Sequence, residues 1–122
     1  MQNEFPYHTR EDNGKASDTP LIQVRASGQS LYTDYMGGDI AETCIRTDRS
    51  SLPTALIFGD SFTNPVECLA YYSFNELRSV DLRHYTVQSL SDYIAAYQPD
   101  VVLCVRDYQS LLLREFNGAF FS

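Results

Sequence analysis

The sequence has no tryptophan, only three cysteines, no cluster of basic residues and no hydrophobic run long enough to cross a bilayer. Its net charge of −7 argues against a nucleic-acid partner, because such binding requires a basic surface. Cys44, Cys68 and Cys104 show no C-x-x-C spacing and are odd in number, which argues against a zinc site and a complete disulfide framework. We expect buried thiols at Cys68 and Cys104, and no metal or organic cofactor.

Signals for secretion are also absent from the sequence. The first residues show neither the basic segment nor the apolar segment of a signal peptide. Taken as it stands, the chain is therefore expected in the cytoplasm. If it is a piece of a longer protein, its first residues say nothing about where that protein is located. At 122 residues it can form one domain with a hydrophobic core. We expect a flexible polar arm over residues 1–19, which includes His8, and a single domain over 20–122.

The stretch from Thr54 to Pro65 is the clearest local pattern in the chain. An apolar run over residues 55–58 predicts a strand, and small polar residues after Gly59 predict a tight turn. Pro65 suits the first position of a helix, which we expect over residues 65–74. Ser61 then lies on the turn beside a helix N-terminus, where free backbone N–H groups can hold an anion.

The rest of the chain predicts an α/β fold. Runs that favour β-structure occur at 21–25, 31–35 and 43–47, and a turn is expected at Asp12–Lys15. Strands are expected at 77–82 and 101–105, and helices at 87–98 and 109–116, the last with an Asn117–Gly118 cap. The order βαβαβ over 54–105 predicts a three-layer parallel sheet with right-handed crossovers and extra N-terminal β segments. The apolar run at 101–105 is typical of a strand covered on both faces.

Polar residues follow each of the three parallel strands. They are Asp60 and Ser61 after the first, Asp81, Arg83 and His84 after the second, and Arg106, Asp107 and Tyr108 after the third. In open parallel sheets ligands bind beyond the carboxyl ends of the strands, where the strand order reverses. A strand order of 2-1-3 would bring the first and third groups to the two sides of one crevice.

Each candidate has two interpretations. Ser61 can be a nucleophile or a hydroxyl that caps the next helix, and His84 can be its base or an ordinary surface histidine. Gly59 and Asp60 are assigned to the turn. Arg83 and Arg106 can bind an anion or steady an oxyanion, or they can form ion pairs with the neighbouring aspartates. Tyr108 can donate a hydrogen bond into the crevice or simply pack.

Three blocks in this order resemble a known family. Leu56–Asn64 contains a Gly-Asp-Ser motif, and Val80–Tyr85 and Pro99–Leu103 extend the match over about residues 50–118. Together they are similar to SGNH hydrolases of the DHHW family, relatives of alginate-acetylating proteins that modify bacterial surface polysaccharides. The resemblance implies a flavodoxin-like sheet, a place in the cell envelope for longer members, and O-acetyl transfer or ester hydrolysis on a carbohydrate. Ser61 carries over as the nucleophile, and Asn64, Arg83, Arg106 and Tyr108 are candidates for binding the oxyanion or substrate.

The chain departs from the family pattern at the general base. The family takes its catalytic Asp and His from a motif upstream of the serine, and this sequence contains no Asp-His pair. Other SGNH hydrolases use Asp-x-x-His near the C-terminus, but here Ser110 stands three residues after Asp107. The chain therefore resembles the C-terminal portion of such a protein, and a missing segment or a partner chain would supply the Asp-His motif.

Two functional hypotheses follow, from different classes. The first is a serine esterase or O-acetyltransferase of SGNH type, incomplete in this chain, with a carbohydrate or acyl-ester substrate and His84 or another chain's histidine as the base. The second is a non-catalytic glycan- or protein-binding module that retains the SGNH fold. A nucleotide-binding domain is disfavoured, since the turn after the first strand has only Gly59 and lacks a glycine-rich signature. The oligomeric state is not predicted.

Overall fold

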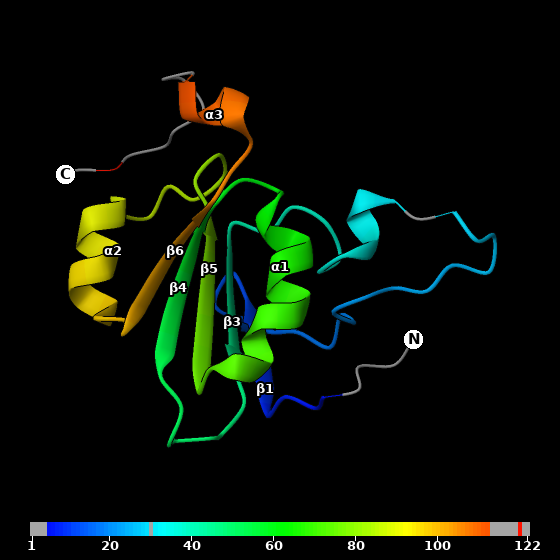
Figure 1. The fold of residues 1–122 in the computed structure, drawn as a ribbon, viewed down its shortest axis with the longest axis horizontal. Coiled ribbons are helices and arrows are strands. Elements are labelled where there is room, and N and C mark those ends of the chain that lie inside the picture. Colours follow the sequence, from blue (N-terminus) through cyan, green and yellow to red (C-terminus); the bar gives the residue numbers. More distant parts are fainter. Residues whose placement is uncertain (1–4, 30, 113–119, 121–122) are drawn as a thin grey trace.

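A six-stranded mixed sheet forms the centre of the computed structural model, which describes residues 5–29, 31–112 and 120 (Figure 1). The strand order is β2-β1-β3-β5-β4-β6. In chain order the strands are β1 (Thr9–Asp12), β2 (Lys15–Ala16), β3 (Glu42–Arg46), β4 (Thr54–Gly59), β5 (Glu76–Asp81) and β6 (Val101–Val105). Only β5, β4 and β6 run parallel, in the predicted order 2-1-3. The parallel unit predicted over 54–105 is therefore confirmed, and β1, β2 and β3 extend it into a mixed sheet because they pair antiparallel.

Two helices cover the two faces of the parallel strands (Figure 1). On one face Ile57 of β4 packs in a cluster with Cys68 and Tyr71, at the end of helix α1 (Thr63–Ala70) and just after it. On the other face Leu56 packs in a cluster with Leu90 and Tyr93 of helix α2 (Leu90–Tyr97). Neighbouring residues of a strand point to opposite faces, so the apolar run of β4 reflects burial on both sides.

The N-terminal part of the chain joins the sheet, in contrast to the arm expected over residues 1–19. Residues 9–16 form the β1–β2 hairpin, and Asn13 and Gly14 turn it with φ of 50° and 76°. Positive φ at both central residues gives the twist that a two-residue hairpin needs. The strands expected at 21–25 and 31–35 are wrong: the two segments share one isolated bridge, Ile22 to Tyr35, and the second contains a 3₁₀ turn at Tyr32–Asp34.

The third parallel strand is more exposed than its sequence predicts. β6 lies at the outer edge of the sheet, and Val102 and Leu103 remain 42% and 37% exposed. Cys104 is exposed as well, so the expectation of a buried thiol is wrong there. Cys44 and Cys68 are buried, and burial raises the pKa of each to about 11. An apolar run of strand length indicates a strand but does not distinguish a central strand from an edge.

The helices start and end close to the expected positions. α1 begins at Thr63, two residues before Pro65, so Pro65 takes the third position; the first turn needs no intrahelical N–H donor there. A 3₁₀ turn at Tyr71–Ser73 completes the segment. Ser89 caps α2 by accepting the Asp92 N–H, and α3 spans Tyr108–Leu112. The expected continuation of α3 to residue 116 and the cap at 117–118 lie outside the described residues.

Membrane insertion through a helix has no support in the described part of the chain, where every helix is too short or too polar to cross a bilayer.

A buried arginine fastens the hairpin to the loop that follows it. The side chain of Arg10 is fully buried and donates hydrogen bonds to the carbonyl oxygens of Thr19 (2.8 Å) and Met36 (2.6 Å). Its charge is balanced by Asp12, at 3.0 Å. Both partners that lie far along the chain are backbone groups, so Arg10 holds two segments of irregular loop against the hairpin.

We expect Arg10→Met to destabilise the fold by about 3–5 kcal/mol, because it leaves the Asp12 carboxylate without its buried cation and removes the donors to the loop. Urea unfolding monitored by circular dichroism measures the loss. Lys15→Met, at an exposed position of the same hairpin, is the control and should change the unfolding free energy by less than about 0.5 kcal/mol. Equal effects of the two variants would contradict this account.

Candidate active-site edge

The carboxyl ends of β4, β5 and β6 meet at one edge of the sheet, as the strand order requires (Figure 1). The N–H of Leu82, after β5, donates to the carbonyl oxygen of Gly59 at the end of β4 (2.9 Å). The N–H of Asp107, after β6, donates to a carboxylate oxygen of Asp60 (3.0 Å). The three groups of polar residues predicted at strand ends therefore lie on this edge.

Gly59 is needed here because the end of β6, the neighbouring strand of the sheet, comes very close to it. A Cβ at this position would lie 1.8 Å from the carbonyl oxygen of Val105 and 2.8 Å from its carbonyl carbon. Since the obstacle is backbone, no side-chain rotation could make room. The glycine thus permits the close approach of the two strands on which the geometry of the edge depends.

Asp60 holds the turn that follows Gly59. The residue is buried, and its carboxylate accepts the N–H of Phe62 (2.9 Å) and the N–H of Asp107 (3.0 Å). Its own carbonyl oxygen accepts the N–H of Thr63 at 3.0 Å, where α1 begins. With both carboxylate oxygens bound to backbone N–H groups, Asp60 acts as a turn residue that links β4 to the end of β6.

Ser61 stands on this turn with its hydroxyl uncommitted. The N-cap of α1 is Phe62, and no side chain caps the helix. The Ser61 carbonyl accepts the N–H of Asn64 (3.1 Å), but among the described residues no hydrogen bond joins its hydroxyl to another group. Ser61 is partly exposed. The geometry therefore speaks against the capping interpretation and leaves the hydroxyl accessible to a ligand.

His84 and Arg83 lie beside Asp39 and Asp81 at the same edge. Arg83 binds Asp81 through two hydrogen bonds, Nε–Oδ1 at 3.0 Å and Nη2–Oδ2 at 2.7 Å, and Nη2 also lies 3.1 Å from Asp39. These hydrogen bonds raise the pKa of Arg83. The Nε2 atom of His84 lies 3.6 Å from Asp39, and about half of the His84 side chain is exposed. His84 thus has a carboxylate near it, while within the described part of the chain no hydrogen bond joins its ring to the Ser61 hydroxyl.

Asp39, Asp81 and His84 are also the residues of this edge that could hold a metal ion. Each offers one ligand atom, and these atoms lie within 4.8 Å of one another. The guanidinium of Arg83, however, lies against both carboxylates and already supplies the positive charge that a cation would bring. The donor set therefore fits an ion-pair cluster better than a metal centre.

The other candidates take different positions. Asn64 is buried, and its side-chain nitrogen donates to the carbonyl oxygen of Gly38 (3.1 Å). The guanidinium carbon of Arg106 lies 6.0 Å from the centre of the Phe120 ring. Tyr108 is 69% exposed, so it does not pack in the core, and its hydroxyl accepts a hydrogen bond from Gln109 (3.2 Å).

Two residues near the edge were not foreseen. Asp39 follows a Gly-Gly turn that gives no hint of a distant partner, and only the tertiary structure brings it to Arg83 and His84. Glu67 lies in α1 with 3% of its surface exposed and is hydrogen-bonded by the hydroxyl of Ser79 in β5. Burial raises the pKa of this carboxyl. The sequence signal for burial was that Glu67 stands among apolar residues of the predicted helix.

Comparison with known proteins places the fold. The sequence matches no protein-family model, and no curated protein matches it. The structure is similar to that of Bacillus cereus PatB1 with a sulfonyl adduct (TM-score 0.75, 23% identity over 94% of this chain and 41% of that chain). A second PatB1 structure gives a TM-score of 0.74 with 24% identity, covering 92% of this chain and 39% of that chain. A DHHW family protein from Eubacterium siraeum gives 0.71 with 24% identity, covering 93% of this chain and 40% of that chain.

These similarities confirm the predicted resemblance at the level of fold. The chain shares its α/β architecture with PatB1 and with a DHHW family protein. It spans about 40% of the length of these proteins. TM-scores of 0.71–0.75 establish the architecture, and identities of 23–24% leave the chemistry to be argued from the residues at the strand ends.

We expect Gly59→Ala to disrupt the edge, because its methyl group would overlap the Val105 carbonyl. The loss of stability should exceed the roughly 1–3 kcal/mol typical of an overpacked core. Thermal unfolding followed by circular dichroism measures it. Ser61→Ala, which removes an uncommitted hydroxyl two residues away, should keep the wild-type melting temperature. A Gly59→Ala variant that melts with the wild type would refute the close approach of the two strands.

The buried carboxyl of Glu67 predicts a pH-dependent stability. Its folded pKa lies above the unfolded value of 4.5, so its contribution is complete below that pH and is lost as the pH rises through the folded pKa. Relative to Glu67→Gln, the wild type should therefore lose unfolding free energy between about pH 5 and about pH 8. Urea titrations at both pH values test this, with Asp18→Asn as the exposed control. If the wild type and the Glu67→Gln variant differ by the same amount at both pH values, this account of the carboxyl is wrong.

Proposed function

We propose that this chain is an SGNH/DHHW-like module of flavodoxin-like type for acyl chemistry on carbohydrate esters, with Ser61 as the nucleophile. The carrying observation is the Ser61 hydroxyl, uncommitted among the described residues, on the turn between β4 and α1, where Asp60 accepts the N–H groups of Phe62 and Thr63. A nucleophile must be held in place by its backbone and remain accessible to the substrate, and it is activated by a base within hydrogen-bond reach. The shared fold with PatB1, one structure of which carries a sulfonyl adduct, supports the same assignment, since sulfonyl groups bond to activated nucleophiles.

The proposed reaction proceeds in two steps. The Ser61 oxygen attacks the carbonyl carbon of an acetyl ester, its proton passes to a base, and the ester C–O bond breaks as the leaving alcohol takes that proton. Water or a sugar hydroxyl then attacks the acetyl-serine, giving up its proton to the base, and the Ser61 oxygen leaves and recovers a proton. Water as the acceptor gives hydrolysis, and a sugar hydroxyl gives O-acetyl transfer.

Activity of this chain depends on a base that accepts the proton of Ser61. His84 is the candidate within the chain, with Asp39 as its orienting carboxylate at 3.6 Å. Because no hydrogen bond joins its imidazole to the Ser61 hydroxyl among the described residues, proton transfer requires a side-chain rotation or a bridging water. A histidine from a further segment or a partner chain is the other source, and without any base the serine would retain only a small part of the rate.

A second candidate function is a non-catalytic glycan- or protein-binding module with the same fold. The observation in its favour is the ion-pair cluster of Arg83, Asp81 and Asp39, which occupies the edge with groups that already satisfy one another. Under this alternative Ser61 is a surface hydroxyl of the turn. The two functions differ in one measurable property, the reactivity of Ser61.

We expect the purified chain to hydrolyse p-nitrophenyl acetate and to gain one adduct mass with phenylmethanesulfonyl fluoride. Ser61→Ala should lose both properties. His84→Ala should lower turnover about 10²-fold or more if His84 is the base, the scale of general-base catalysis. Ser51→Ala, an exposed serine in a loop, is the matched control and should behave as the wild type. Turnover at the buffer background in all variants, with no adduct, would reject the acyl assignment for this chain and favour the binding module.

A further inference from the structure

Strand β6 is an edge of the sheet without the usual protection. It pairs with β4 on one side, and among the described residues no strand pairs with its other side. Its sequence, Val-Val-Leu-Cys-Val, contains no charge and no proline. Soluble proteins commonly protect an edge strand by charge, by proline or by shortness, because its unpaired N–H and C=O groups attract another strand. The opposite edge follows this rule, since β2 is two residues long and includes Lys15.

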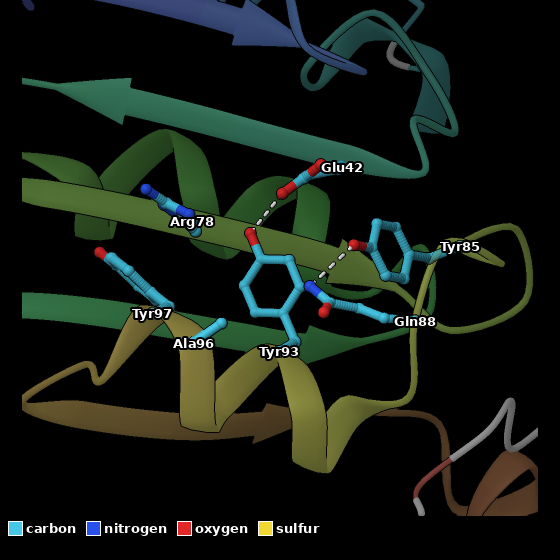
Figure 2. A pocket seen from close by; sticks show the side chains of 7 residues that line it. All are labelled: Glu42, Arg78, Tyr85, Gln88, Tyr93, Ala96 and Tyr97. Carbon is cyan, nitrogen blue, oxygen red and sulfur yellow. Dashed lines mark hydrogen bonds between the residues drawn. The ribbon is translucent and has the colours of Figure 1, made fainter. Parts of the chain in front are cut away.

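The helices that cover the sheet leave the middle of β6 open. On the α2 side, Tyr93 donates its hydroxyl proton to Glu42 of β3, and the Tyr97 hydroxyl lies 3.3 Å and 3.4 Å from carbonyl oxygens of β5 and β4. These rings lean away from β6 and line the tyrosine groove, a polar hollow of about 250 Å³ beside α2, β3 and β5 that Tyr85 and Arg78 also line (Figure 2). On the other side, α1 contacts β4 and β5.

Both faces of β6 are exposed as a result. Val102 is 42% exposed and Leu103 37%, and successive residues of a strand point to opposite faces. In the neighbouring strand β4, Leu56 and Ile57 are fully buried. β6 therefore combines the composition of a buried parallel strand with the exposure of an edge, and its surface fits a partner that is itself a strand.

The apolar residues of β6 are complementary to a second copy of the same strand. A two-fold axis perpendicular to the sheet sets two β6 strands antiparallel, so every contact occurs twice. With Leu103 on the axis, Val101 lies opposite Val105 of the other copy, and Val102 lies opposite Cys104. Residues that oppose each other in an antiparallel pair share a face. Each apolar side chain of the strand thus meets an apolar side chain of the other copy.

The charges that flank β6 select this register. Asp100 stands directly before the strand and Arg106 directly after it. With Leu103 on the axis, Asp100 comes opposite Arg106 of the other copy. The next register in one direction sets Asp100 opposite Asp107, a like charge, and the next register in the other direction sets it opposite Val105. A carboxylate has two oxygens and a guanidinium has five N–H donors, so the pair can form in addition to contacts within each copy.

We infer that β6 is a dimer interface, at which two copies of this chain pair their β6 strands antiparallel about a two-fold axis through Leu103. The sheet then continues from one copy into the other. A second copy is the occupant because both the apolar residues and the flanking charges of the strand complement themselves. The two strand-end edges point in opposite directions, so each copy keeps its own Ser61. The interface and the proposed function can therefore fail separately.

Sedimentation velocity of the chain, from micromolar concentration to about 1 mM, tests the inference. A reductant keeps Cys104 as a thiol. Salt at about 0.15 M screens charges more than about 8 Å apart, which matters because each copy carries a net charge of −7. We expect an equilibrium between monomer and dimer. A monomer at every concentration would overturn the inference, as would assemblies larger than a dimer, because a two-fold pairing uses up the β6 edge.

Two leucine substitutions locate the interface. Leu103→Lys sets two like charges against each other on the axis and should weaken the dimer about tenfold or more, a difference of about 1.4 kcal/mol. Leu69→Lys, at a 77% exposed position of α1, is the matched control and should form dimers as the wild type does. Circular dichroism shows whether both variants are folded. Equal dimerisation by the two variants would place the contact elsewhere and reject β6.

A disulfide tests the register. In the inferred pairing the new thiol of Val102→Cys lies opposite the native Cys104 of the other copy, so mild oxidation should join the two chains covalently. The new thiol of Val101→Cys lies opposite Val105 and should not do so. Denaturing gels without reductant measure the joined fraction. If the Val101→Cys variant joins as readily as the Val102→Cys variant, the antiparallel pairing about Leu103 is wrong.

Discussion

The carboxylate of Asp60 is the interaction on which the proposed site depends. It accepts one N–H from the turn before α1 and one from the segment after β6, so a single buried side chain joins two strand ends that are 47 residues apart in the sequence. This link is possible because Gly59 lets the backbone of Val105 approach without a Cβ in the way. Together these residues place Ser61 on a rigid turn at the strand-end edge. The hydroxyl is positioned by its backbone alone, and a base within hydrogen-bond reach is the further part that an attacking group would need.

Buried polar side chains also hold the N-terminal part of the chain in place, by hydrogen bonds to backbone groups. Arg10 ties the hairpin to the loop through two carbonyl oxygens, and Asn64 ties the start of α1 to the carbonyl of Gly38. The second contact brings the segment of Asp39 to the strand-end edge, where it meets His84 and Arg83. Burying such groups is costly unless every donor and acceptor is paired, so these pairings help to specify one arrangement of a loop with little regular secondary structure.

The molecule offers two surfaces with different chemistry. The strand-end edge holds a serine hydroxyl, a histidine and an ion-pair cluster, whereas the groove beside α2 holds rings and balanced polar groups. The residues that line the groove include none of the residues of the strand-end edge.

The sequence by itself determined the elements whose patterns are local. The strand, turn and helix around Ser61, the order βαβαβ, the 2-1-3 arrangement of parallel strands and the Asn13–Gly14 turn could all be predicted, since periodicity and turn chemistry act over a few residues. Only the tertiary structure decided that residues 9–12 pair with β3, that β6 is an edge strand with Cys104 exposed, and that Asp39 meets His84. The tyrosine groove was equally hidden, because its residues come from β3, β5 and α2. Such features depend on which surfaces meet across long stretches of chain, and that is settled by packing and by the pairing of buried charges.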